Sequence, residues 1–284
     1  MIPQEFNYSR PASLEEALAL LAGGAKALAG GQSLIPLMKL RLASPEHLVD
    51  LSRISDLNFI REEGGAIHIG AMSTHYQVES SALLRSKCPL LSEAAGHIGD
   101  MQVRNMGTIG GSIAHADPAA DYPASLLALE AKVRLVAAGS DRTISIADFL
   151  VDVFTTACAA GEIVTEVIVP VEDARAGVSY QKMLQPASGF AIVGAAARVV
   201  KSGNRISMAR VGMTGLAPKA FRAAGVEKLL EGTAGTSADI QKAAAAVTDG
   251  VEANSDLHAS AEYRRHVARV YTVRALTVAL SRAS

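Results

Sequence analysis

The first part of the chain is organised around Ala25-Lys26-Ala27-Leu28-Ala29-Gly30-Gly31-Gln32-Ser33-Leu34. Residues 25–29 form a short apolar run, which predicts a buried strand, and the paired glycines predict a tight turn after it. Residues 34–42 then predict a helix, since Pro36 falls in the first turn, where a proline is tolerated. A strand, a glycine-rich turn and a helix in this order indicate an α/β unit.

The residues on either side complete this unit. Ser13-Leu14-Glu15-Glu16 has the serine and glutamate spacing of a capping box, so we expect a helix that begins at Leu14 and stops at Gly23. Residues 47–51 predict a second short strand. We therefore expect a compact α/β subdomain over residues 1–55.

Two hairpins are expected further along, with turns at residues 63–65 and 139–141, because glycine-containing turns there separate apolar runs. Short helices are expected from about Thr74 and after Pro89, and residues 96–118 are a glycine-rich segment. Residues 162–169 are rich in β-branched side chains and predict a strand that Pro170 closes.

Residues 172–177 are polar and lack periodicity, and we expect a domain boundary near Arg175. Three strands are predicted beyond it, followed by three helices. The strands are expected at residues 178–184, 190–201 and 205–216, and the helices at 218–231, 237–252 and 261–281. A run of strands followed by helices is typical of a small α+β domain.

The composition narrows the class of protein. The chain has 284 residues with 27 basic and 28 acidic side chains, and this balance argues against a nucleic-acid-binding surface. Its two cysteines, Cys88 and Cys158, are too few for a disulfide framework, an iron–sulfur cluster or a four-cysteine zinc site. No apolar run is long enough to span a membrane, and we expect a cytoplasmic protein without a signal peptide.

Two glycine turns are the candidate binding elements. They are Ala29-Gly30-Gly31-Gln32-Ser33-Leu34 and Gly107-Thr108-Ile109-Gly110-Gly111-Ser112-Ile113. The N–H groups of such turns can form an anion-binding nest, so two of them could hold the two phosphates of a dinucleotide. The simpler alternative is that both are only tight turns. The P-loop and Rossmann fingerprints, H-E-x-x-H and G-x-S-x-G are all absent.

Polar residues follow the second turn. Asp117 and Asp121 lie four positions apart and could face one ribose, amide donor or cation, or they could instead cap a helix that starts near Tyr122. His115 could act as a base, although a lone histidine is more often structural. Neither a catalytic residue nor a metal ligand is assigned from these patterns.

Several segments, in order along the whole chain, resemble the FAD-binding medium subunit of the molybdenum hydroxylases, which include carbon monoxide dehydrogenase and the xanthine dehydrogenase group. The N-terminal ones are Ile2-Pro3-Gln4-Glu5-Phe6-Asn7-Tyr8-Ser9-Arg10-Pro11-Ala12-Ser13-Leu14, Leu28-Ala29-Gly30-Gly31-Gln32-Ser33-Leu34-Ile35-Pro36-Leu37-Met38-Lys39 and Gln102-Val103-Arg104-Asn105-Met106-Gly107-Thr108-Ile109-Gly110-Gly111-Ser112. The others are Glu162-Ile163-Val164, Tyr180-Gln181-Lys182 and Pro186-Ala187-Ser188-Gly189-Phe190-Ala191.

The resemblance implies an α+β fold in two domains. Residues 1–175 would form a FAD-binding region of the vanillyl-alcohol-oxidase (PCMH) type, with α/β subdomains at about 1–55 and 56–175. Residues 176–284 would form a domain of the carbon monoxide dehydrogenase flavoprotein type, with a three-stranded antiparallel sheet and helices.

The resemblance also implies which residues contact FAD. Backbone N–H groups of the two turns would hold the pyrophosphate, Lys182 would reach FAD, and Phe190 would lie near the flavin ring. The full set is Ala29, Gly30, Gly31, Gln32, Ser33, Leu34, Ile98, Thr108, Ile109, Gly110, Gly111, Ser112, Asp117, Asp121, Val164, Lys182 and Phe190.

The sequence departs from the family pattern at two places. Ser112 stands where the second turn usually ends in asparagine. Residues 115–121 differ from the Gly/Asn-rich version of carbon monoxide dehydrogenase and are closer to subunits that serve organic substrates. We therefore expect an organic substrate, such as an N-heterocycle or an aldehyde, rather than carbon monoxide.

The function that the resemblance implies is electron transfer. A large partner chain would carry the molybdenum–pterin centre, a small partner chain would carry two [2Fe–2S] clusters, and FAD on this chain would pass the electrons to an external acceptor. A dimer of heterotrimers is the expected assembly. Two alternatives remain open: a self-sufficient flavin oxidase or reductase that uses His115 or Tyr122 for proton transfer, and an interaction module without a cofactor.

Overall fold

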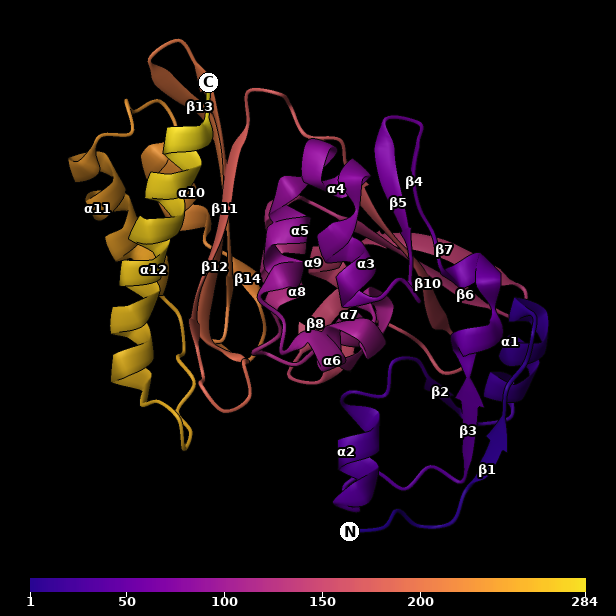
Figure 1. Cartoon of the computed structure of the whole chain (residues 1–284). Coiled ribbons are helices and arrows are strands. Elements are labelled where there is room, and N and C mark those ends of the chain that lie inside the picture. Colours follow the sequence, from indigo (N-terminus) through magenta and orange to yellow (C-terminus); the bar gives the residue numbers. More distant parts are fainter.

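The computed structural model describes residues 1–284 and shows three parts side by side (Figure 1). A small N-terminal unit, which carries the protruding helix α2, lies at one end. A central α/β part follows, and a C-terminal sheet packs one face on it while helices α10, α11 and α12 cover the other face. The α+β class expected from the sequence is confirmed.

The N-terminal unit is a parallel three-stranded sheet of order β1-β3-β2 with two helices. Its strands and helices match the prediction except for β1, which the sequence did not indicate because its three residues pair only with distant residues of β3. The elements are β1 (Asn7–Ser9), α1 (Leu14–Ala22), β2 (Lys26–Leu28), α2 (Leu34–Lys39), β3 (His47–Asp50) and the 3₁₀ turns η1 (Leu51–Arg53) and η2 (Ser55–Leu57).

Helix α1 begins where expected, but only half of the predicted capping box forms. The Ser13 hydroxyl accepts a hydrogen bond from the Glu16 N–H at 3.2 Å. The Glu16 carboxylate accepts from the N–H of Ala12 at 3.3 Å rather than from that of Ser13. The serine alone is sufficient to start the helix, because it satisfies one of the free N–H groups of the first turn.

The central part contains an antiparallel sheet of order β4-β5-β10-β6-β7 and a set of short helices. Both predicted hairpins are confirmed. The strands are β4 (Ile60–Glu63), β5 (Ala66–Gly70), β6 (Lys132–Ala137), β7 (Ser140–Ser145) and β10 (Ile163–Pro170), with a separate pair β8 (Leu150–Asp152) and β9 (Thr155–Thr156). The helices are α3 (His75–Ser80), α4 (Ala82–Lys87), α5 (Pro89–Gly96), α6 (Met101–Met106), α7 (Ile109–His115), α8 (Asp121–Ala128) and α9 (Ile146–Phe149).

The glycine-rich segment of residues 96–118 contains two helices that the sequence did not indicate, α6 and α7. Each begins at a side-chain cap: Asp100 accepts from the N–H of Val103 at 2.8 Å, and Thr108 accepts from the N–H of Gly111 at 3.1 Å. The two glycines of α7 lower its intrinsic helix propensity, and its first turn is held instead by carbonyls of the preceding chain, described below.

The C-terminal sheet has four antiparallel strands of order β11-β12-β13-β14, rather than three. The additional strand has only two residues, which pair with Gly212 and Met213, and so short a segment has no alternating pattern to reveal it. The elements are β11 (Gly177–Leu184), β12 (Ala191–Ser202), β13 (Arg205–Thr214), β14 (Phe221–Arg222), α10 (Ala224–Leu230), α11 (Ser237–Ala245), η3 (Ala246–Thr248) and α12 (Ala261–Arg282).

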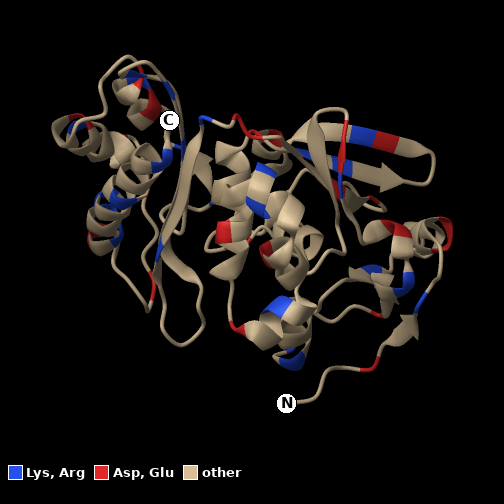
Figure 2. Cartoon of the chain, turned by 45° about the horizontal axis from the view of Figure 1, so that its top comes forward, with Lys and Arg blue, Asp and Glu red and all other residues tan.

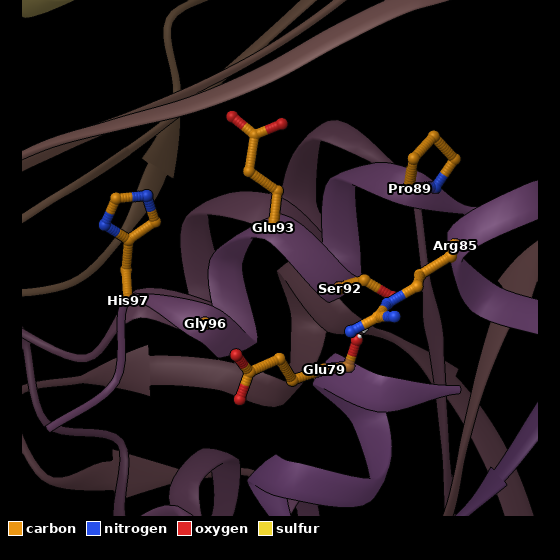
Figure 3. Close-up of a pocket in the computed structure, with 7 residues that line it drawn as sticks. All are labelled: Glu79, Arg85, Pro89, Ser92, Glu93, Gly96 and His97. Atoms are coloured by element: carbon orange, nitrogen blue, oxygen red, sulfur yellow. Dashed lines mark hydrogen bonds between the residues drawn. The ribbon is translucent and has the colours of Figure 1, made fainter. Parts of the chain in front are cut away.

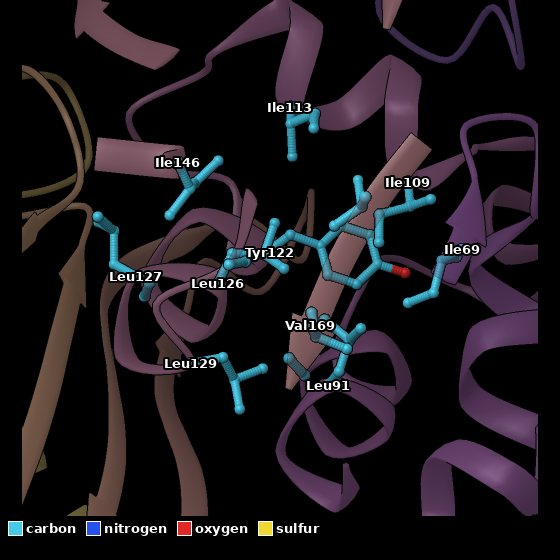
Figure 4. Close-up of a cluster of buried hydrophobic side chains, with 14 of the residues drawn as sticks. Ile69, Leu91, Ile109, Ile113, Tyr122, Leu126, Leu127, Leu129, Ile146 and Val169 are labelled. Carbon is cyan, nitrogen blue, oxygen red and sulfur yellow. The ribbon is translucent and has the colours of Figure 1, made fainter. Parts of the chain in front are cut away.

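The largest hydrophobic cluster, shown in part in Figure 4, surrounds Tyr122. It is built mainly from the central part, but Val178, Tyr180 and Ala196 of the C-terminal sheet belong to it as well. The two parts therefore share apolar packing across the junction between α8 and the strands β12 and β13.

The connection between the two parts is short. Strand β10 ends at Pro170 and β11 begins at Gly177, and no helix or strand lies between them. Glu172 in this segment is paired with Arg198 of β12 at 2.7 Å, so the connection is fastened to the C-terminal sheet. The division of the chain near residue 175 stays a prediction.

Acidic and basic residues are interspersed along the ribbon (Figure 2), and the formal net charge of the chain is −1. None of the helices combines the length and apolar character needed to cross a membrane.

Candidate functional site

The structure brings the two predicted glycine turns together. A Cβ atom at Gly30 would overlap the carbonyl oxygen of Met106 and lie 2.7 Å from the Cα of Gly107. On the other side of the contact, a Cβ at Gly111 would lie 3.4 Å from the Cβ of Ala29. Residues 29–34, the first loop, thus pack directly against residues 107–112, the second loop. Gly30 is required for this close approach.

The first loop has unused hydrogen-bond donors. None of the backbone N–H groups of residues 30–33 donates a hydrogen bond within the chain. Gly31 holds a left-handed conformation with φ of 73°, and Ser33 precedes α2 without forming a side-chain cap. Free N–H groups need partners, and an anion with several oxygens can satisfy a set of them at once.

In the second loop, the N–H groups of residues 109–112 are already paired with acceptors of the chain. Ile109 and Gly110 donate to the carbonyl oxygens of Ser73 and Ala71 at 3.0 and 2.9 Å. Gly111 and Ser112 donate to the hydroxyl and the carbonyl of Thr108 at 3.1 and 3.0 Å. The expectation that this turn is an open backbone nest is therefore not met. The loop leaves two groups without a hydrogen bond in the chain, the N–H of Thr108 and the hydroxyl of Ser112.

The glycines of the second loop serve packing. A Cβ on Gly110 would overlap the Cβ of Ala71 and lie 2.7 Å from its carbonyl oxygen. A Cβ on Gly107 would lie 2.5 Å from Nε2 of the His75 ring. The backbone N–H of His75 donates to the Gly107 carbonyl at 2.9 Å. Burial lowers the pKa of His75 to about 4, because the charged ring would lose its hydration.

Val164 belongs to the part of the structure that supports the second loop. It belongs to β10, and the carbonyl of the next residue, Thr165, accepts from the N–H of Ala71 at 2.9 Å. Since Ala71 in turn contacts Gly110, β10 supports the second loop from beneath. Val164 is buried in the hydrophobic cluster of the central part.

Asp121 and Lys182 form a buried ion pair. The Lys182 Nζ lies 2.9 Å from a carboxylate oxygen of Asp121, and the two side chains are only 1% and 5% exposed. The Tyr180 hydroxyl donates to the same carboxylate at 2.5 Å. Burial raises the pKa of Asp121 to about 6, although the lysine opposes this shift.

The expected cap roles differ between the two aspartates. Asp117 accepts from the N–H of Ala119 at 2.8 Å and so caps a local turn. Asp121 is the first residue of α8, and its carboxylate is directed to Lys182 instead of to the helix N–H groups.

Lys182 also joins two further predicted residues. Its ammonium donates to the carbonyl of His97 at 2.7 Å and to that of Gly189 at 2.6 Å. Ile98 and Phe190 are the residues that follow these carbonyls. Ile98 packs on the central cluster, while Phe190 is 43% exposed. With Asp121, all three lysine N–H groups have acceptors within the chain, and the contact of Lys182 with a cofactor stays a prediction.

Sequence reasoning missed His97, Tyr180 and Gly189. Tyr180 had a usable signal, because residues two apart in a strand lie on one face and Tyr180 is two before Lys182. The carbonyls of His97 and Gly189 had none, since backbone groups carry no sequence signature.

The residues proposed for proton transfer in the alternative of a self-sufficient oxidase are poorly placed. Tyr122 is fully buried (Figure 4), with its hydroxyl 3.2 Å from Nδ1 of His75, and burial raises its pKa well above the usual value. The His115 ring packs 5.0 Å from that of Phe154, and partial burial lowers its pKa.

A polar pocket lies between α3, α4 and α5 (Figure 3). Within it Glu93 accepts from the N–H of Tyr180 at 3.0 Å and pairs with Arg282 at 2.7 Å. None of the residues predicted from the sequence lines this pocket, whose lining residues are Glu79, Arg85, Pro89, Ser92, Glu93, Gly96 and His97.

Two family models together match nearly the whole chain. The FAD-binding domain in molybdopterin dehydrogenase matches residues 4–172. The carbon monoxide dehydrogenase flavoprotein C-terminal domain matches residues 178–279.

Individual relatives match over the full length. The medium chain of carbon monoxide dehydrogenase from Hydrogenophaga pseudoflava is 41% identical, over 99% of each chain. The medium chain of glyceraldehyde dehydrogenase from Sulfolobus acidocaldarius is 40% identical, over 97% of this chain and 98% of the relative. A solved structure of carbon monoxide dehydrogenase from Hydrogenophaga pseudoflava superposes with a TM-score of 0.97 at 42% identity and covers 100% of both chains.

The two glycine loops, the two matched family models and the full-length relatives all point to one family. The chain belongs to the family of FAD-binding medium subunits of the molybdenum hydroxylases.

Proposed function

We propose that the first loop binds the pyrophosphate of FAD through the N–H groups of residues 30–33. The observation that carries this proposal is that these four groups have no partner in the chain, although the loop is held firmly against its neighbour. A pyrophosphate presents several acceptor oxygens and negative charge, which such a nest suits. The Ser112 hydroxyl of the second loop is free to add a further donor.

The remaining predicted residues have distinct places in this proposal. The second loop supports the first through Thr108, Ile109, Gly110 and Gly111. In the first loop, the donor residues 30–33 are flanked by Ala29 and Leu34. Phe190, exposed at the end of its loop, and Ile98 offer apolar surface to the flavin ring. Val164 supports the second loop from β10, and Asp117 shapes the turn before α8. The division into domains near residue 175 belongs to the same proposal.

The reaction step that we assign to the chain is electron transfer. FAD, when bound, supplies the ability to collect single electrons and release them in pairs. We propose that these electrons come from [2Fe–2S] clusters on a small partner chain and leave to an external acceptor. Two cysteines are too few to ligate such a cluster on this chain, which supports placing the clusters elsewhere.

We further propose that a large molybdenum–pterin chain carries out the substrate chemistry, and that the three chains assemble as a dimer of heterotrimers. Relatives of this chain are medium chains or subunits of larger dehydrogenases. The proposed location is the cytoplasm. An organic substrate such as an aldehyde or an N-heterocycle is supported by relatives named for glyceraldehyde and caffeine. The identity to the carbon monoxide relative is equally high, so this choice rests on residues 115–121.

A matched pair of substitutions tests the pyrophosphate site. Ser33→Asp places a negative charge at the nest, in a residue that precedes α2 and forms no side-chain cap. Ser13→Asp makes the same change at the start of α1, where the serine does cap. A negative charge is favourable at the N-terminus of a helix, and both residues directly precede one, so neither variant should lose folding stability.

We expect Ser33→Asp to weaken FAD binding about 10- to 100-fold, because two like charges near a protein surface repel by a few kcal/mol. Ser13→Asp should bind FAD like the parent chain. Titration of the FAD-free chain, followed by flavin fluorescence, measures both. Equal affinity of the two variants would refute the site.

A further inference from the structure

The ammonium of Lys182 is enclosed by three segments that are far apart in the sequence. It contacts Asp121 of α8, the carbonyl of His97 after α5 and the carbonyl of Gly189. With a side chain that is 1% exposed, it has no contact with solvent. All three of its N–H groups have acceptors, so the lysine is a fixed three-way link.

The link fastens the tip of the loop of residues 185–190, which joins the paired strands β11 and β12, to the central part. Within the loop, the N–H of Gln185 donates to the Phe190 carbonyl and the N–H of Gly189 donates to the Gln185 carbonyl, each at 2.8 Å. These bonds close the loop on itself, and the pairing of Leu184 with Ala191 fixes its base in the sheet, but none of them ties the tip of the loop to the central part. Beyond the loop, Ala191 donates to the carbonyl of Ala119 at 3.2 Å.

The opposing surface is the turn of residues 97–99. Gly189 holds a φ of 74°, and a Cβ there would lie 3.3 Å from the Cα of Gly99. The lysine therefore clamps two backbone segments that already touch, one from the central part and one from the C-terminal sheet. Phe190 directly follows the clamped residue.

Asp121 is what keeps the buried ammonium in place. It supplies the counter-charge, and the Tyr180 hydroxyl holds the carboxylate from the other side at 2.5 Å. A buried charge without a partner is strongly unfavourable, so the lysine would not remain between the two carbonyls without it.

We propose that Lys182 is a positioning residue, which fixes the Phe190 loop against the 97–99 turn, with Asp121 as its anchor. The lysine then acts on the flavin environment through Gly189 and Phe190. This consequence rests on the proposed function, whereas the positioning itself can be measured without FAD.

The chain contains no tryptophan, so Phe190→Trp places a single fluorescent reporter in the loop. Lys182→Met in this background removes the ammonium and keeps most of the side-chain volume. The matched control is Lys219→Met, because Lys219 also donates to a backbone carbonyl of the central part, that of Leu150 at 2.9 Å, away from this loop.

In the full FAD-free chain, we expect Lys182→Met to lower the tryptophan anisotropy and to raise the rate of chymotrypsin cleavage in the loop at least tenfold. Lys219→Met should change neither. After FAD is added, the visible circular dichroism of the bound flavin should change in Lys182→Met only. If Lys182→Met does not fold, Lys182→Met with Asp121→Asn replaces it, since this pair leaves no charge buried alone.

The positioning role is overturned if the folded lysine variant matches the Lys219→Met control in anisotropy and cleavage rate. An unchanged flavin spectrum with a loosened loop would overturn the effect on the flavin. Failure of the chain to bind FAD at the first loop would refute the proposed function but would leave the anisotropy result intact, so the two failures are distinguishable.

Discussion

The first and second loops have similar sequences and opposite hydrogen bonding. Both carry paired glycines and a hydroxyl, and they pack against each other. In the first loop the N–H groups of residues 30–33 are free, whereas in the second loop the N–H groups of residues 109–112 are bonded to the chain. One loop therefore offers donors to a ligand, and the other is the support that holds those donors in place.

The difference shows that a glycine pair has two distinct uses. Glycine allows the chain to expose its N–H groups in a tight turn, and it also allows two backbones to touch. Gly31, with its left-handed conformation, is an instance of the first use, and Gly110, packed on Ala71, is an instance of the second. Changes at the packed glycines of the second loop should therefore affect stability, and changes at the free N–H groups of the first loop should affect binding.

The largest effect is expected for Gly110→Ala. The new methyl group would overlap Ala71 on a buried backbone contact, and we expect the free energy of unfolding to fall by about 3 kcal/mol or more. Gly31→Ala should cost only about 1–2 kcal/mol, because its neighbour is the movable side chain of Ile35 and the main cost is the positive φ. Urea denaturation of the FAD-free chain compares them, and a larger loss at Gly31 would reverse the assignment.

Acidification should also weaken the second loop. His75 has a pKa of about 4 in the folded chain and about 6.5 when unfolded, so the unfolded state takes up a proton first as the pH falls. The free energy of unfolding should then fall by up to about 3 kcal/mol between pH 6.5 and pH 4, and change no further from this source below pH 4.

His75→Gln isolates this contribution. His97 and His115, whose pKa values are also lowered by burial, act in the same direction, and Asp121, whose pKa is raised, acts in the opposite one. These groups are present in both proteins and cancel when the two pH profiles are subtracted. If the parent and the variant have the same slope between pH 4 and pH 6.5, His75 does not support the loop as described.

A smaller effect is expected at Ser112. Its hydroxyl has no partner in the chain, so Ser112→Ala should leave stability unchanged while FAD binding weakens about 3- to 10-fold, the worth of one hydrogen bond. Ser112→Asn, which restores the residue usual at this position of the family, should bind at least as tightly as the parent. An alanine variant with unaltered FAD affinity would remove Ser112 from the site.

Local patterns predicted much of the fold. Helix α1 has a capping serine and an apolar face, and the hairpins have glycine turns between apolar runs, so these elements are visible in the sequence. Strand β1 and helix α7 are not, because β1 exists only by pairing with β3 and α7 is held by the carbonyls of Ala71 and Ser73. Both depend on contacts that sequence spacing does not encode.

The candidate site divides in the same way. The glycine loops could be found from their composition and from the resemblance to a family. Which N–H groups stay free could not, because it depends on carbonyls of residues 71 and 73. Nor could the pairing of Asp121 with Lys182 be predicted, since 61 positions separate them and only packing brings them together.

The central claim is that the first loop, and not the second, donates its backbone N–H groups to FAD. Amide hydrogen exchange of the full chain, measured by NMR with and without FAD, tests it directly. We expect residues 30–33 to exchange rapidly without FAD and at least tenfold more slowly with it, while residues 109–112 exchange slowly in both states. If FAD instead protects residues 109–112 and leaves residues 30–33 unchanged, the assignment of the two loops is wrong.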